Sequence, residues 1–202
     1  MVLIFLINSG HGQCLDSEAI DAACISLFKS GYSVWTLTGE NCCYKNAEVS
    51  SWWNAHYMIH GNMSTYNLAF YGHIEPRRDC IDITRINEYD KLFLPFHVPG
   101  HWILFVCSIK RRKIELYDSL WSIRRSGLAA IFVVPYLNSF FGFSADEQWE
   151  IVNHGYSSPQ QSNGVDCGIF VIHTLLCIVR GEPSVTPPPA NFRSTVLSWI
   201  LG

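Results

Sequence analysis

Three apolar stretches in the middle of the chain carry its strongest pattern of hydrophobic and polar positions. They cover residues 92–96, 101–109 and 114–118; a Pro99-Gly100 turn follows the first and a basic run, Lys110 to Lys113, follows the second. Short apolar runs bounded by turn residues are typical of buried strands. The pattern therefore predicts three successive strands, the last two forming a hairpin with a solvated basic turn.

Helical periodicity predicts two helices before these strands. Residues 16–27 place apolar side chains on one face, behind an Asp16 that is suited to cap a helix start. Residues 46–58 give a weaker pattern of the same kind. The opening run Met1 to Ile7 is expected to be a first strand rather than a signal peptide, because it lacks a basic leader and a small-residue cleavage site.

A long apolar run near the other end of the chain predicts a buried helix. It extends from Cys167 to Arg180 and is followed by Gly181 and Pro183, which are helix-stop residues. A proline cluster then connects to a last helix over residues 190–202. Strands and helices together indicate an α+β domain with a mixed central sheet packed against the helix that begins at Cys167.

Composition narrows the possible classes of protein. The 202 residues are 49% apolar and 15% charged, which excludes disorder and favours one tightly packed domain. A formal charge of −3 gives no general attraction to nucleic acid, and no run approaches the roughly 20 apolar residues that span a bilayer. The eight scattered cysteines include no Cys-x-x-Cys pair. They favour reduced thiols and an intracellular protein of the cytoplasm or nucleus.

A zinc site is a weak alternative use of four residues. His56 and His60 are spaced to share a helix face, and Cys42 and Cys43 are the nearest thiols. Adjacent cysteines chelate poorly, so neither a metal nor any other cofactor is expected.

The predicted hairpin brings a histidine and a carboxylate together. If it folds about the Ile109-Lys110 bond, His101 lies opposite Asp118. An imidazole held by a carboxylate can act as a general base. A nucleophile for it is available in Cys167, because the free N–H groups and dipole at a helix start favour a thiolate.

The loop before Cys167 offers a donor for an oxyanion hole. Residues 159–168 form a polar, turn-prone segment that runs directly into the helix. Either Gln161 or Gln160 could direct its amide at a developing oxyanion, together with the backbone N–H of Cys167.

These residues, taken in order, resemble a known family. His101-Trp102, Asp118-Ser119-Leu120 and the segment from Gln160 to Gly168 resemble the ubiquitin-like-protein proteases, the SUMO-specific cysteine peptidases related to the adenovirus endopeptidase. The resemblance implies the papain-like or adenain-like fold of that family. It also selects Gln161, six residues before the cysteine, and assigns His101 as base, Asp118 as its orienting partner and Cys167 as nucleophile.

The resemblance also implies a substrate. The family cleaves after the C-terminal glycine of a ubiquitin-like modifier such as SUMO, ubiquitin or a relative, and Trp102 corresponds to one of two tryptophans that clamp the glycine tail. The other tryptophan position is Cys14 here, and Ser17 replaces a frequent acidic residue. Trp35, Trp52 and Trp53 are candidates for the missing wall.

The resulting expectation is one catalytic domain over residues 1–202. Residues 13–91 would be the substrate-recognition part, 92–180 the catalytic core and 190–202 the C-terminal helix. It would act as a monomeric cysteine protease or isopeptidase on a modifier and its conjugates, without nucleic acid or membrane. The alternatives are a viral-type polyprotein-processing endopeptidase, an acyltransferase of the same clan, and a non-catalytic modifier-binding module.

Overall fold

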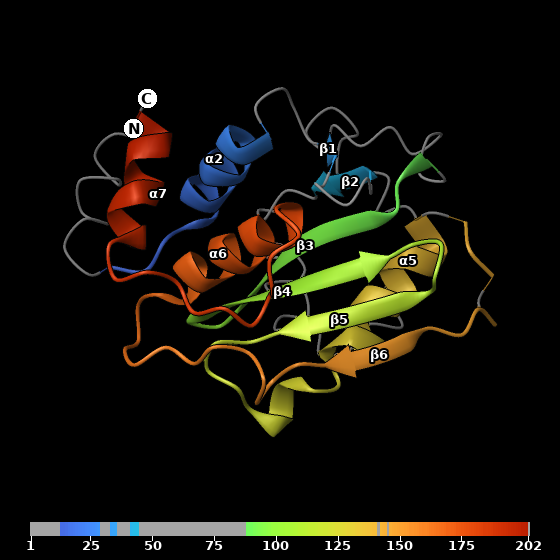
Figure 1. The fold of residues 1–202 in the computed structure, drawn as a ribbon. Coiled ribbons are helices and arrows are strands. Elements are labelled where there is room, and N and C mark those ends of the chain that lie inside the picture. Colours follow the sequence, from blue (N-terminus) through green and yellow to red (C-terminus); the bar gives the residue numbers. More distant parts are fainter. Residues whose placement is uncertain are drawn as a thin grey trace.

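A mixed sheet of six strands organises the structure, a computed structural model that describes residues 13–28, 33–35, 41–44, 88–140, 142–144 and 146–201. The strands lie in the order β1-β2-β3-β4-β5-β6. Pairs β2/β3 and β5/β6 are parallel, and the other three neighbouring pairs are antiparallel. Figure 1 shows three helices, α2, α6 and α7, on one face of the sheet and α5 on the other. The predicted α+β class is confirmed.

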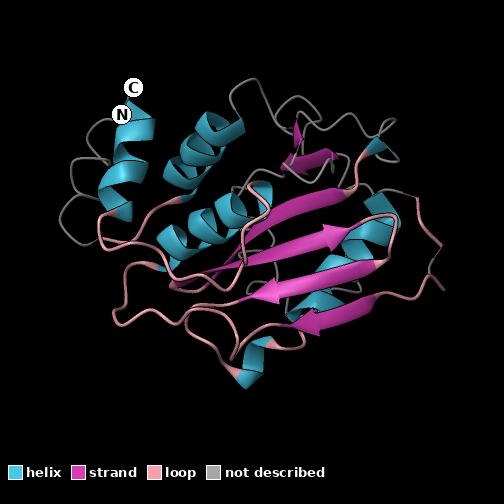
Figure 2. Ribbon diagram, viewed as in Figure 1, coloured by secondary structure: helices cyan, strands magenta, loops and turns pink. Residues whose placement is uncertain are grey.

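The centre of the sheet is built from the three predicted strands. They are β3 (Lys91–Val98), β4 (His101–Ser108) and β5 (Lys113–Tyr117), and they form the middle of the sheet in Figure 2. Gly100 has a φ of 73°, so the Pro99-Gly100 turn has the left-handed second residue that glycine supplies without strain. This turn places Val98 opposite His101.

The β4/β5 hairpin has a different register from the predicted one. Leu104 lies opposite Tyr117 and Ser108 opposite Lys113, so the turn is centred one residue later in the chain than the Ile109-Lys110 bond. The difference arises because Ile109 to Arg112 form a four-residue turn in which Arg112 takes a φ of 51°. His101 and Asp118 are therefore diagonal neighbours rather than directly opposed residues.

The two faces of the sheet carry separate apolar clusters. Alternate β4 residues Trp102, Leu104 and Val106 pack with α2 (Ser17–Phe28), α6 (Cys167–Val179) and α7 (Phe192–Leu201). The intervening residues Ile103, Phe105 and Cys107 pack with the π-type turn η4 (Ala129–Val133) and α5 (Val134–Phe140). Strand β4 is buried along its whole length, including its first residue, His101.

The helix ends follow the predicted signals. The Asp16 side chain accepts a hydrogen bond from the Ala19 backbone N–H at 2.8 Å, as a helix N-cap does. Helix α6 begins at Cys167 and is closed by Gly181, whose φ is 68°. The predicted buried helix is confirmed at both ends.

Several elements were not predicted. They are strands β1 (Ser33–Trp35), β2 (Asn41–Tyr44) and β6 (Glu150–Asn153), the short helix η3 (Ile123–Arg125), η4 and α5. The strands are only three or four residues long, which is too short for a period-2 pattern to stand out.

Two predicted elements, the first strand over residues 1–7 and the helix over 46–58, lie outside the described residues. So do His56, His60, Trp52 and Trp53, and the side chains of Trp35, Cys42 and Cys43 are not described either. Among the residues that are described, no helix is both long and apolar enough to span a membrane. Nor do these residues contain a cluster of three or more potential metal ligands.

Candidate active site

A hydrogen-bonded imidazole and carboxylate form the centre of the site. His101 begins β4, Asp118 follows β5, and His101 Nε2 lies 2.7 Å from Asp118 Oδ1. Their side chains are 6% and 1% exposed. The two residues that the sequence paired therefore do meet, across the diagonal of the hairpin.

Three donors surround the Asp118 carboxylate. Besides His101, the Leu120 backbone N–H donates to Oδ1 at 3.0 Å and Arg125 Nε donates to Oδ2 at 2.7 Å. Burial acts to raise the pKa of Asp118, but the hydrogen bonds from His101, Arg125 and Leu120 outweigh it and hold that pKa below its ordinary value. An ionised carboxylate only accepts hydrogen bonds, so the proton between the pair resides on His101 Nε2.

The other imidazole nitrogen is available for chemistry. Nδ1 of His101 is buried and has no hydrogen-bond partner in the part of the chain that the structure describes. With the proton of the neutral ring on Nε2, Nδ1 carries a lone pair. A buried acceptor of this kind is what a general base requires.

The thiol of Cys167 opens onto the same cavity as this imidazole. The cavity has a volume of about 240 Å³, and its lining includes His101, Trp102, Cys167, Cys14 and Leu15. Cys167 is placed there as the first residue of α6, at the end of the helix that carries partial positive charge. A nucleophile and a base candidate thus share one cavity.

The ionisation of Cys167 differs from the expectation that a helix start alone favours a thiolate. Burial raises the pKa of the Cys167 thiol, and the nearby Cys14 adds to this effect. Backbone hydrogen bonds from Trp102, Gly168 and Cys167 itself act in the opposite direction but do not overcome it. The thiol therefore needs a proton acceptor, and desolvation is the reason that the helix terminus does not suffice.

The two glutamines of the preceding loop have different roles. Gln160 is committed to the backbone: its Oε1 accepts from the Trp121 N–H, and its Nε2 lies 3.0 Å from the carbonyls of Asp118, Gly155 and Ser158. Gln161 is buried; its Oε1 accepts from Ser119 Oγ at 2.7 Å.

The Gln161 amide retains donor capacity. Its Nε2 donates to the Asn163 carbonyl at 2.6 Å. An amide nitrogen carries two hydrogens, so one is left for another acceptor. Of the two glutamines, only Gln161 could serve an oxyanion, although it does not line the cavity shared by His101 and Cys167.

Trp102 is fixed from two sides. Its indole N–H donates to the Leu15 carbonyl at 2.9 Å, and its ring lies 4.7 Å from the His97 ring. Cys14 is exposed, and its sulfur lies 3.5 Å from the Gly164 carbonyl. Cys14 therefore adds a small side chain to the lining of the cavity that Trp102 also lines.

An arginine from α7 braces the loop that leads to the nucleophile. Arg193 Nε lies 2.9 Å from Asp166 Oδ1, and its guanidinium also bonds the carbonyls of Val165 and Gln13, each at 3.1 Å. Asn163 donates to the other Asp166 oxygen at 2.7 Å. The residue before Cys167 is therefore tied to both the last helix and the segment before α2.

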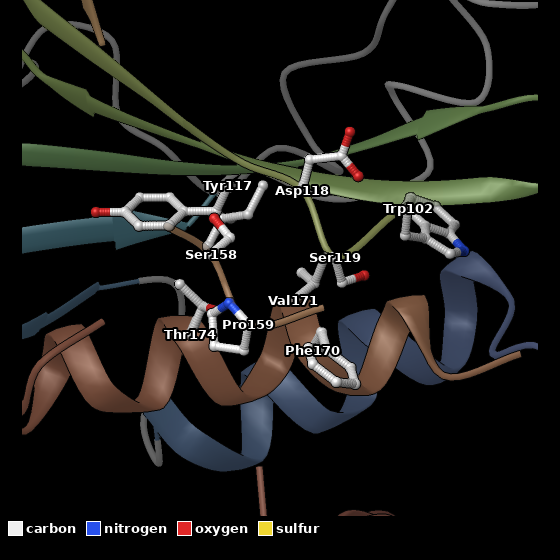
Figure 3. A pocket seen from close by; sticks show the side chains of 10 residues that line it. Trp102, Tyr117, Asp118, Ser119, Ser158, Pro159, Phe170, Val171 and Thr174 are labelled. Atoms are coloured by element: carbon white, nitrogen blue, oxygen red, sulfur yellow. The ribbon is translucent and has the colours of Figure 1, made fainter. Parts of the chain in front are cut away.

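A second cavity, between the sheet and α6, is distinct from the site. It measures about 10 Å³ and includes Asp118, Tyr117 and Thr174 in its lining. In Figure 3 the Asp118 carboxylate points away from α6. Because neither His101 nor Cys167 lines this cavity, it is a packing gap and not the place of reaction.

Sequence reasoning missed three residues of the site: Arg125, Arg193 and His97. Only His97 had a usable signal, because a two-residue Pro99-Gly100 turn places it opposite Trp102. The arginines reach their carboxylates from η3 and α7, whose positions depend on the tertiary fold.

A sequence profile and several known proteins match this chain. The profile of the Ulp1 protease family, C-terminal catalytic domain, matches residues 73–186, more than half of the chain. Ubiquitin-like-specific protease 1 of Saccharomyces cerevisiae is 31% identical over 91 residues, which are 44% of this chain and 14% of that protein. Ubiquitin-like-specific protease 1A of Arabidopsis thaliana is 31% identical over 101 residues, 48% of this chain and 20% of that protein. The chain thus spans a fifth or less of the length of these relatives.

Solved structures share the fold. The SUMO protease Ulp1 with its catalytic cysteine oxidised to a sulfenic acid has a TM-score of 0.67 at 21% identity, covering 94% of this chain and 78% of that one. The Ulp1 protease domain in complex with Smt3, the yeast orthologue of SUMO, has a TM-score of 0.63 at 21% identity, covering 93% and 76%. The predicted fold family is confirmed.

Proposed function

Because the chain belongs to the Ulp1 protease family, we propose that it is a cysteine peptidase that cleaves after the C-terminal glycine of a ubiquitin-like modifier. The observation that carries the proposal is the free, buried Nδ1 of an imidazole held by Asp118, at a cavity that the Cys167 thiol also lines. Residues 92–180 would form the catalytic core, residues 13–91 the modifier-recognition part and 190–202 the C-terminal helix.

The reaction would begin with transfer of the Cys167 proton to His101 Nδ1 as the sulfur attacks the glycine carbonyl. Asp118 would stabilise the resulting imidazolium through Nε2. A new C–S bond forms, and the carbonyl π electrons move onto oxygen, where Gln161 and the Cys167 backbone N–H would bind the oxyanion.

Collapse of this intermediate would break the C–N bond. The departing lysine amine takes the proton from His101, leaving a thioester between Cys167 and the modifier. Water, deprotonated by His101, then attacks the thioester and releases the modifier carboxylate and the free thiol. No step in this sequence requires a cofactor.

The cavity offers a passage for the modifier tail. Trp102 lines it and is fixed by its hydrogen bond to Leu15, and Cys14 lines it as well. A flat, side-chain-free glycine tail could pass between them, and the small Cys14 would leave more room than a second indole. The width of this passage would determine which modifier tails can enter.

The test is a panel of ubiquitin, SUMO and other modifiers that carry a C-terminal electrophile. Covalent adducts are scored by mass and the modified cysteine is mapped by peptide analysis. We expect one modifier class to label Cys167, with no adduct in Cys167→Ala and a loss of several orders of magnitude in turnover for His101→Ala. No labelling by any modifier, or labelling that persists in Cys167→Ala, would refute the proposal.

The adduct panel, together with a peptide-cleavage assay and an acetyl-transfer assay, separates the alternatives. Cleavage of glycine-containing viral peptides without any modifier adduct would indicate a processing endopeptidase. Transfer of an acetyl group from acetyl-coenzyme A to Cys167 would indicate an acyltransferase. Binding of a modifier without an adduct would indicate a non-catalytic module.

A further inference from the structure

Arg125 contacts the carboxylate that holds the imidazole. It lies seven residues after Asp118, at the end of η3, and its Nε donates to Asp118 Oδ2 at 2.7 Å. Another guanidinium nitrogen bonds the Leu120 carbonyl. The arginine therefore links the end of η3 to the carboxylate at the start of the same loop.

The two oxygens of Asp118 have separate tasks. Oδ1 receives His101 and the Leu120 N–H, whereas Oδ2 receives Arg125. A carboxylate held at one oxygen can rotate about its Cβ–Cγ bond, but one held at both oxygens cannot do so without losing a charge-assisted hydrogen bond. Since Asp118 is 1% exposed and Arg125 is 22% exposed, solvent cannot easily replace the bond on the carboxylate side.

We propose, on the basis of the proposed function, that Arg125 is a positioning residue: its guanidinium fixes the plane of the Asp118 carboxylate and thereby the orientation of His101 towards the Cys167 thiol. The arginine itself reaches no reacting atom. It acts only through Asp118.

The segment that carries Arg125 is anchored for this role. The Trp121 backbone N–H donates to Gln160 Oε1 at 3.0 Å, and the Trp121 ring stacks on Tyr156 with centroids 4.0 Å apart. Ser122 caps η3 through a hydrogen bond from the Arg124 N–H at 3.3 Å. These contacts attach the loop after β5 to neighbouring chain segments, and a positioning residue needs support of this kind.

Gly155 makes this anchor possible. A Cβ atom at that position would lie 1.5 Å from Cδ1 of Trp121, inside the indole ring. The close approach of ring and backbone packs Trp121 against the chain segment that follows β6.

Removing the guanidinium would leave Oδ2 of a buried carboxylate without its charged donor. A positive charge at this distance lowers the pKa of an aspartate, because it favours the ionised form. Without it, the pKa of Asp118 would rise and the carboxylate would gain freedom to rotate. Either effect weakens the hydrogen bond by which Asp118 orients the His101 ring.

The experiment compares Arg125→Gln, Arg125→Lys and the control Arg124→Gln, which removes an exposed neighbouring charge. The first readout is the rate of Cys167 alkylation by chloroacetamide from pH 4 to 9, which needs no modifier. The second is kcat and KM for the modifier substrate over the same range. Melting temperature verifies that each variant is folded.

For Arg125→Gln we expect the acid limb of both profiles to move to higher pH, because Asp118 then becomes protonated at a higher pH. We also expect kcat to fall roughly 10- to 100-fold with KM unchanged. Arg125→Lys should restore the position of the acid limb, because the charge is retained, but only part of kcat, because the second hydrogen bond is lost.

Two results would overturn the proposal. One is an Arg125→Gln profile that superimposes on that of Arg124→Gln; the other is a lower rate with no movement of the acid limb in Arg125→Gln and no rescue by lysine. If no modifier is a substrate, the proposed function fails, but the alkylation profile still decides the role of Arg125.

Discussion

Asp118→Asn is the substitution for which the structure predicts the most specific consequence. The carboxylate accepts hydrogen bonds from three sources: His101, the Leu120 N–H and Arg125. An asparagine is nearly the same size but has one oxygen instead of two. At least one donor must then face the new NH₂ group.

Either orientation of the asparagine amide disturbs the site. With its oxygen towards His101 and Leu120, the NH₂ group faces the Arg125 guanidinium, and two donors oppose each other in a buried position. With its oxygen towards Arg125, the NH₂ group faces His101 Nε2, which must then become an acceptor. In that case the ring proton moves to Nδ1, the nitrogen proposed to take the proton from Cys167.

The expected decrease in kcat follows from these two orientations of the asparagine amide. Loss of one buried hydrogen bond to a charged group costs about 1.5–3 kcal/mol, equivalent to a roughly 10- to 150-fold change in rate. A wrong histidine tautomer in a triad of this type lowers kcat by about 10⁴-fold. We therefore expect Asp118→Asn to lower kcat by roughly 10- to 10⁴-fold, less than the loss caused by removing the thiol.

The assay is steady-state turnover of the modifier substrate identified by the electrophile panel. Asp90→Asn is a matched control, because it removes the carboxylate of an exposed ion pair with Lys110 at 2.7 Å. We expect this control to retain wild-type activity. A decrease of less than tenfold for Asp118→Asn would refute the reasoning, because it would mean that the imidazole is positioned without the carboxylate.

The same substitution predicts a change in acid stability. Since the pKa of Asp118 is lowered in the folded state, its ionised form stabilises the fold at pH values above the ordinary aspartate pKa of about 4. This stabilisation is lost as pH falls through the lowered folded-state pKa. The difference in unfolding free energy between wild type and Asp118→Asn, measured by urea titration, should therefore be constant near neutral pH and shrink below about pH 4.

Three other predictions concern the nucleophile and its surroundings. Cys167→Ala should abolish turnover and leave the melting temperature within a few degrees of the wild type; residual cleavage would exclude this thiol as nucleophile. Gln161→Ala should lower kcat by about 10²- to 10³-fold with little change in KM if its amide serves the oxyanion, and an unchanged kcat would exclude that role. Gly168→Ala places a Cβ 3.0 Å from Leu15 Cβ. We therefore expect about 1–3 kcal/mol of destabilisation in urea titration, and weaker modifier binding because Trp102 shifts with Leu15. Wild-type values of both quantities would contradict this prediction.

The part of the fold that could be predicted is the part whose signals are local. Residues 91–117 combine long apolar runs with a Pro-Gly turn, and α6 combines an apolar run with a glycine stop, so each element is identifiable from its own residues. The predicted register of the β4/β5 hairpin was wrong, because the four-residue turn at 109–112 has no glycine, asparagine or proline to mark its centre.

The sequence predicted those contacts of the site that lie within one hairpin. His101 and Asp118 meet in spite of the wrong register, because an even shift keeps both side chains on the same face of the hairpin. The raised pKa of Cys167 was not predictable, since it depends on burial among groups distant in sequence. The same is true of Arg125, whose approach to Asp118 requires the intervening loop to turn back.

The hydrogen bond between Trp102 and the Leu15 carbonyl has a wider consequence. The proposed base lies on the sheet and the proposed nucleophile lies on helix α6. Leu15 is close to both elements. Its carbonyl accepts a hydrogen bond from the indole of Trp102, next to His101, and its side chain occupies the space that a side chain at position 168 would need. A ligand that displaced the chain ahead of α2 by even a fraction of an ångström would alter the gap between sulfur and imidazole. A ligand contact remote from the scissile bond could in this way change the distance between the reacting sulfur and imidazole.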